Sequence, residues 1–250
     1  MAHMSDARLD GRLLDAAWDF ADPVGSETRL RSLRDELGVA SLAGMEVTTQ
    51  IARALGLQGR FGEAQQLLDG VVDGDTIVGA RLALERGRLL NSSGDPGAAI
   101  PWFRAGVRLA EAGGDGYLVV DGLHMLAIVE SDHCADWTTA ALLIVASSSD
   151  PRVQRWAGAL HNNLGWHLHD AGDLDGALGA FESALMACER TGTLNQVHIA
   201  RWTVARCLRS LWRLEEALAI QQRLRRDDEP DAFVDEEIAI LEELKLRSGE

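Results

Sequence analysis

Residues 159–185, ALHNNLGWHLHDAGDLDGALGAFESAL, determine the fold class of this chain. Small and apolar residues recur at helical spacing on both sides of Gly172, and a glycine commonly ends a helix. Ala177 follows this turn residue by five positions. Where two antiparallel helices approach closely, one needs a small residue and the other a larger one that fills the gap. The stretch therefore predicts a helical hairpin.

The same hairpin pattern recurs along the chain. Five turn residues are each followed, five positions later, by an alanine: Gly59 and Ala64, Gly94 and Ala99, Ala135 and Ala140, Gly172 and Ala177, and Trp212 and Ala217. The alanines are 35, 41, 37 and 40 residues apart, which fits a two-helix repeat of about 34 residues or slightly more. The third unit can be framed from its turn or from its first helix, because the register slips by one between Ala127 and Ala135. In the fifth unit Trp212 replaces the turn glycine, and Gln221 replaces a large apolar residue.

The pattern resembles the tetratricopeptide repeat family. The matching positions are Leu164, Gly165, Gly172, Ala177, Phe181 and Ala184 in residues 159–185, and Gly87, Gly94, Ala99, Ile100 and Phe103 in the second unit. The resemblance covers about residues 41–227. It implies an all-α, right-handed superhelical solenoid of about five helix pairs with capping helices. It also implies that the first helices of the pairs line a concave groove that binds peptides or partner proteins.

The flanking segments complete the expected organisation. We interpret residues 1–3 as a cloning remnant, 4–40 as N-terminal capping helices, 41–227 as five repeats and 231–250 as a C-terminal capping helix. The segment DEEIAILEELKLR, residues 235–247, supplies the polar outer face that the end of a solenoid needs. Two Asp-Pro pairs, Asp95-Pro96 and Asp150-Pro151, predict helix starts, because aspartate accepts a hydrogen bond at the N-cap and proline suits the first helical position.

Composition and charge exclude several classes of function. The 250 residues carry 39 acidic against 24 basic side chains, a formal net charge of -15, and a field of that sign repels nucleic acid and anionic lipid. The three cysteines, Cys134, Cys188 and Cys207, are an odd number without CxxC spacing, which fits a reducing compartment. The longest apolar run, residues 140–146, is far shorter than the roughly 20 residues of a membrane-spanning helix. We expect a cytoplasmic protein with no nucleic-acid or membrane partner.

The repeat frame directs a set of polar and aromatic side chains into the concave groove. These candidate ligand-binding residues are Arg53, Arg88, Asn91, His124, Asn162, Trp166, His169, Trp202, Arg206 and Arg209. Guanidinium groups bind carboxylates or phosphates in a bidentate manner, and tryptophan offers a flat stacking face. The set therefore favours an acidic or carboxylate-bearing ligand. The alternative is that these arginines form ordinary ion pairs with neighbouring carboxylates.

We expect no catalytic residues, metal site or cofactor. His167 and His169 lie two positions apart on different helix faces, whereas a chelating helical pair needs a spacing of three or four. The phosphate-binding GxxxxGK and the nucleophile motif GxSxG do not occur. The sequence thus favours a non-catalytic scaffold that binds a protein or peptide. The alternative function is a sensor or enzyme for a small anionic metabolite in the concave pocket, and Trp18, Phe20 and Phe233 leave homo-oligomerisation possible.

Overall fold

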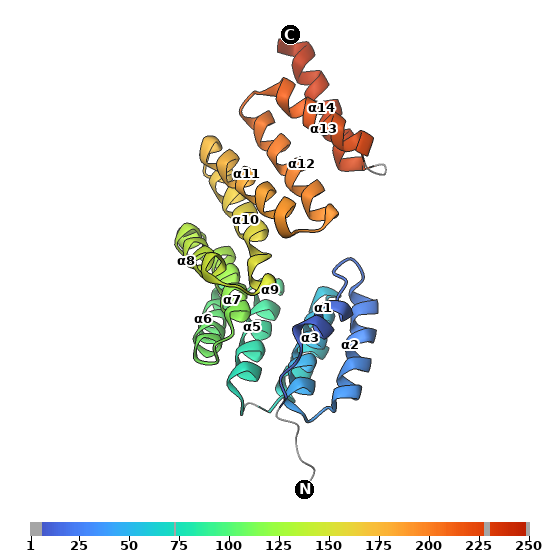
Figure 1. The fold of residues 1–250 in the computed structure, drawn as a ribbon, viewed down its shortest axis with the longest axis vertical. Coiled ribbons are helices and arrows are strands. Elements are labelled where there is room, and N and C mark those ends of the chain that lie inside the picture. Colours follow the sequence, from blue (N-terminus) through green and yellow to red (C-terminus); the bar gives the residue numbers. More distant parts are fainter. Residues whose placement is uncertain (1–6, 73, 228–230, 249–250) are drawn as a thin grey trace. The chain divides into compact units, whose positions relative to one another are not determined.

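The computed structural model describes residues 7–72, 74–227 and 231–248, so the predicted cloning remnant lies outside the described residues. All regular elements within these ranges are helical, which confirms the all-α prediction (Figure 1). The chain divides into two compact units, Met1–Glu130 (unit 1) and Ser131–Glu250 (unit 2), which we describe separately. None of the helices in the described ranges is long and apolar enough to cross a membrane.

Unit 1 is built from antiparallel helices that pack on their neighbours in the sequence. Its elements are α1 (Gly11–Ala17), α2 (Pro23–Leu37), α3 (Leu42–Leu57), α4 (Phe61–Asp69), α5 (Thr76–Ser92), α6 (Pro96–Ala112) and α7 (Gly116–Val129). Leu14 of α1, Leu30 of α2 and Ile51 of α3 share one buried cluster. The helices α1 and α2 lie in the range where the sequence predicts N-terminal capping helices.

Unit 2 continues the same alternation of helices. Its elements are a 3-10 turn η1 (Ser131–His133), α8 (Cys134–Ser147), α9 (Pro151–Gln154), α10 (Trp156–Asp170), α11 (Leu174–Thr191), α12 (Leu194–Ser210), α13 (Leu214–Asp227) and α14 (Ala232–Ser248). The helices α10 to α14 each pack on the next one along the chain (Figure 1). Both predicted Asp-Pro helix starts are confirmed: Asp95 caps α6, and Asp150 caps the short α9.

The tight turns within the hairpins follow from a glycine and an aspartate. Gly94 and Gly172 have positive φ angles of 96° and 84°, a backbone conformation that glycine adopts at little cost. The next residue caps the following helix: Asp95 accepts a hydrogen bond from the amide of Ala98, and Asp173 accepts one from the amide of Gly176, both at 3.0 Å. The Gly-Asp pair therefore ends one helix and begins the next.

Close packing inside the hairpins explains the spacing of glycine and phenylalanine. A Cβ atom added to Gly87 would lie 2.6 Å from the ring of Phe103, and one added to Gly165 would lie 2.5 Å from the ring of Phe181. Both phenylalanines are completely buried. The small residue on the first helix is thus required by the ring on the second.

The predicted turn of the third repeat, at Ala135, is wrong. Ala135 lies inside α8, and the connection before this helix is formed by Glu130 and η1. The buried face of α8 consists of Cys134, Thr138, Ala141 and Val145. The buried alanine is therefore Ala141 rather than Ala140, because the 3-10 turn replaces the glycine turn and shifts the helix by one residue.

The fifth hairpin departs from the pattern at two positions. Trp212 adopts the left-handed conformation, φ 60°, at the turn position that Gly59, Gly94 and Gly172 hold elsewhere. Gln221 lies four residues after the buried Ala217, and its side chain is also completely buried. Neither amide atom of Gln221 has a hydrogen-bond partner among the described residues. A buried amide without partners destabilises the folded state.

Replacement of Gln221 by leucine should therefore stabilise the protein. We expect Gln221→Leu to raise the free energy of unfolding by about 1–3 kcal/mol, the range for removing an uncompensated buried polar group. The exposed Gln65, which bonds to Asp69 within α4, provides the control variant Gln65→Leu, whose effect should stay within about 0.5 kcal/mol. Denaturant unfolding measures both. Destabilisation by Gln221→Leu would show that the amide is compensated in solution.

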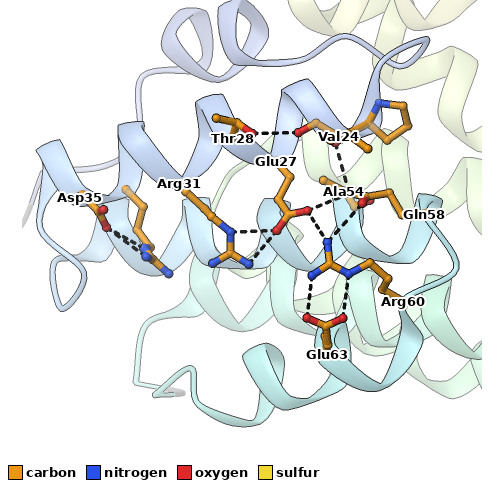
Figure 2. A network of polar contacts seen from close by, with 11 residues as sticks. Val24, Glu27, Thr28, Arg31, Asp35, Ala54, Gln58, Arg60 and Glu63 are labelled. Carbon is orange, nitrogen blue, oxygen red and sulfur yellow. Dashed lines mark hydrogen bonds and ion pairs between the residues drawn. The ribbon is translucent and has the colours of Figure 1, made fainter.

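A network of hydrogen bonds and ion pairs around Glu27 connects α2 to the hairpin of α3 and α4 (Figure 2). The carboxylate of Glu27 accepts hydrogen bonds from Arg31 Nε at 2.9 Å, from Gln58 Nε2 at 2.9 Å and from Arg60 Nη1 at 2.8 Å. Arg60 also pairs with Glu63 at 2.6 Å. Burial alone would raise the pKa of Glu27, but the bonds from Gln58 and Arg31 and the charges of Arg31 and Arg60 lower it overall.

This lowered pKa gives the network a defined pH dependence. A carboxyl whose folded pKa lies below its ordinary value of 4.5 stabilises the fold above that pH, and the contribution disappears as the pH falls through the folded pKa. We expect Glu27→Gln to lower the free energy of unfolding by about 1–2 kcal/mol at pH 7. The difference from the wild type should shrink below about pH 4. A difference that stays constant from pH 7 to pH 3 would contradict this assignment.

Candidate binding faces of the first helices

In unit 1 the first helices α3, α5 and α7 are joined by ion pairs along one face. At one end, Arg81 Nε of α5 lies 2.8 Å from Glu46 Oε2 of α3, with side-chain exposures of 5% and 2%. The backbone amide of Leu9 donates a hydrogen bond to the second oxygen of Glu46 at 3.2 Å. Charges this deeply buried are tolerated because they are paired and hydrogen-bonded.

The next pair along this face centres on Arg88. Its guanidinium binds Glu85 Oε1 of the same helix at 2.7 Å and also pairs with Asp121 of α7. Gln50 of α3 donates a hydrogen bond to the same oxygen of Glu85 at 3.2 Å. Burial raises the pKa of Asp121, but the charges of Arg88 and Arg53 outweigh it and lower that pKa overall. Three successive first helices thus share one charged network.

Arg53 differs from the other arginines of this face. Its guanidinium stacks on the rings of Trp18 and Phe20, 5.8 Å and 5.3 Å from their centroids, and these two rings stack on each other at 4.9 Å. No carboxylate in the described part of the chain lies within ion-pairing distance of Arg53. Burial and the like charge of Arg88 lower the pKa of Arg53, against the opposite effect of Glu85 and Asp121.

The remaining candidates of unit 1 are His124 and Asn91. Burial lowers the pKa of His124 to about 4, and the charges of Arg88 and Arg53 act in the same direction, against Asp121. His124 is therefore neutral at pH 7 and lies within electrostatic range of Arg88, Arg53 and Asp121. Asn91, half-buried near the end of α5, is not joined to the charged network of Arg88 by any hydrogen bond within the described ranges.

In unit 2 the corresponding face is formed by α10, α12 and α14. Glu237 of α14 lies between two arginines of α12: its oxygens are 3.2 Å from Arg206 Nε and 3.0 Å from Arg209 Nε. Arg209 Nη2 also donates a hydrogen bond to Glu237 Oε1 at 3.1 Å. Burial raises the pKa of Glu237, although Arg209 and Arg206 both lower it. A single buried carboxylate is thus held by two guanidinium groups.

The aromatic and polar candidates of unit 2 surround this arginine pair. His169 Nε2 lies 2.9 Å from the hydroxyl of Ser210, to which Arg206 also donates a hydrogen bond at 3.2 Å. The ring of Trp166 contacts His169 and Phe181 edge to face, at centroid distances of 5.5 Å and 5.0 Å. Trp202 packs against the apolar cluster of α13 and α14. Asn162 is half-buried on α10.

The structure also identifies polar residues that the repeat frame did not place in the candidate set. Glu85, Asp121 and Glu237 supply the carboxylates that pair with Arg88, Arg206 and Arg209. Only Glu85 could be recognised locally, because it precedes Arg88 by three helical positions. Arg88, Arg206 and Arg209 thus form intramolecular ion pairs in this structure, as the alternative interpretation of the sequence expects.

Comparisons with known proteins agree with the repeat pattern. Residues 49–114 match the family model described as Tetratricopeptide repeat. No curated protein gives a significant match to the chain. A tetratricopeptide repeat protein from Parabacteroides merdae is similar, with 16% identity, a TM-score of 0.52 and coverage of 95% of this chain and 86% of that one.

Two further solved structures share the fold. BtubC (BKLC) from P. vanneervenii is 16% identical with a TM-score of 0.61, covering 88% of this chain and 94% of that one. A Signal Transduction ATPase with Numerous Domains (STAND) protein with a tetratricopeptide repeat sensor, from Pyrococcus horikoshii, is 15% identical with a TM-score of 0.68. The match covers 86% of this chain but only 33% of that protein. Residues 49–114 thus match the tetratricopeptide repeat model, and the chain shares its helical fold with these solved structures.

Proposed function

We propose that the chain is a non-catalytic scaffold that binds a partner protein or peptide through an acidic or carboxylate-bearing segment. Tetratricopeptide repeats support a general role in protein interaction. The name of the STAND protein from Pyrococcus horikoshii assigns its repeats to a sensor, which agrees with recognition rather than chemistry as the role of such a stack. The finer part of the proposal, the preference for carboxylates, rests on the arginines of the candidate binding faces.

The observation that carries this preference is the position of Glu237 between Arg206 and Arg209. Two guanidinium groups face one buried carboxylate. The side chain of Arg206 is 29% exposed, which leaves part of its guanidinium accessible to a second carboxylate. Charge-assisted hydrogen bonds from arginine to carboxylate are among the strongest polar contacts in proteins. The overall charge of -15 disfavours non-specific polyanions.

A peptide-binding measurement tests this preference. The probe is a fluorescein-labelled peptide of four glutamates and two leucines, and its counterpart has glutamine in place of every glutamate. We expect the acidic peptide to bind more tightly, and Arg206→Gln to weaken its binding about tenfold, equivalent to about 1.4 kcal/mol. The readout is fluorescence anisotropy at low and moderate salt.

Arg201→Gln is the matched control, because Arg201 lies on the same helix and pairs with Glu189 of α11 at 3.1 Å. The control should bind the acidic peptide like the wild type, and thermal unfolding should show that both variants are folded. Equal affinity for the acidic and the glutamine peptide, or equal loss in both variants, would contradict the proposal.

A further inference from the structure

One face of α14 has the pattern of a helical recognition element. Val234, Glu237, Ile238 and Leu241 occupy positions i, i+3, i+4 and i+7, and all four are buried. Helices that bind in protein grooves present their anchoring residues at this spacing. Three apolar side chains and one carboxylate thus define the surface that α14 offers to α12 and α13.

The faces of α12 and α13 that contact α14, here called the groove, match this pattern in apolar contacts and in charge. Val234 and Ile238 join Leu224 of α13 in one buried cluster, against which Trp202 of α12 packs. Leu241 lies in a second cluster with residues of α12 and α13, including Leu208 and Leu214. Between the apolar contacts, Arg206 and Arg209 hold the carboxylate of Glu237. The groove therefore recognises a carboxylate set between apolar anchors on one helix face.

The polar groups in and around this groove are poorly compensated. The indole N–H of Trp202, Arg209 Nε and Glu237 Oε2 are buried without hydrogen-bond partners in the described part of the chain. Burial also opposes ionisation of Glu237 and raises its pKa, despite the two arginines. Uncompensated buried polar groups reduce the net gain from docking a helix. A helix with better partners for these groups would therefore compete effectively with α14.

We propose that the groove of α12 and α13 is a receptor for an amphipathic helix of a partner protein, with the apolar and carboxylate pattern of α14, and that α14 occupies this groove as an internal competitor. The inference rests on the proposed function and specifies the partner as a helix rather than an extended segment. The partner carboxylate takes the place of Glu237 between Arg206 and Arg209. Its apolar residues take the places of Val234, Ile238 and Leu241.

The test uses a labelled synthetic peptide of residues 231–248 as the probe and the full chain as the receptor. We expect saturable binding that Glu237→Gln in the peptide weakens about tenfold. Glu242→Gln removes the same charge from an exposed position of the helix and should leave the affinity unchanged.

A receptor variant tests the competition directly. Leu241→Ala in the full chain removes a completely buried anchor of α14 and should tighten binding of the peptide several-fold, because the internal helix then competes less. Circular dichroism shows whether the rest of this variant remains helical. If the folded Leu241→Ala chain does not bind the peptide, or if both peptide variants bind equally, the inference is wrong.

Three other outcomes have equally clear meanings. Concentration-dependent dimers that exchange α14, detected by sedimentation, would overturn the inference by making a second copy the occupant. If the extended acidic peptide binds and the helical peptide does not, the inference fails while the proposed function stands. If the helical peptide alone binds, with the expected dependence on Glu237, the inference holds and restricts the carboxylate-bearing segment of the proposed function to a helix.

Discussion

Pairing of buried charges between successive first helices is the interaction on which the candidate binding faces of this protein depend. Glu46 with Arg81 joins α3 to α5, and Arg88 with Asp121 joins α5 to α7. In unit 2, Glu237 joins α14 to α12. A charge removed from water is destabilising unless its partner is positioned well. The pairs therefore fix the register between neighbouring hairpins, in addition to the apolar contacts inside each one.

The same pairing determines how the candidate binding faces can bind a ligand. An arginine already bound to a carboxylate attracts a second anion less strongly, so most of the guanidinium charge is unavailable to an incoming group. Arg53, stacked on two aromatic rings, and Arg206, which shares Glu237 with Arg209, are the positions where positive charge is least compensated. A ligand must match these few positions, which favours selectivity over general affinity for anions.

The sequence predicts the hairpins well because their determinants are local. Gly172 with Asp173 forms a turn and a cap, and Gly165 accommodates the ring of Phe181 within the same hairpin. The turn of the third repeat is mispredicted at Ala135, because a 3-10 turn forms the connection without a glycine. The sequence signals this departure only through the missing glycine and the register slip between Ala127 and Ala135.

The binding faces are harder to predict because their partners are distant in the sequence. The repeat frame identifies Arg88, Arg206 and Arg209 but not the carboxylates Asp121 and Glu237, which lie 33 and 28 to 31 residues further along the chain. Asp121 lies in the third repeat, whose register the sequence leaves ambiguous. Glu237 lies in a helix whose sequence predicts a polar outer face, whereas the helix buries one of its carboxylates against α12.

A double-mutant cycle on Glu46 and Arg81 tests the central role of these pairs most directly. The free energies of unfolding of the wild type, Glu46→Gln, Arg81→Met and the double variant give the coupling between the two side chains. We predict a favourable coupling of at least about 1.5 kcal/mol, because both groups are almost fully buried and lie 2.8 Å apart. A coupling below about 0.5 kcal/mol would contradict this account, because apolar packing rather than the ion pair would then hold α3 and α5 together.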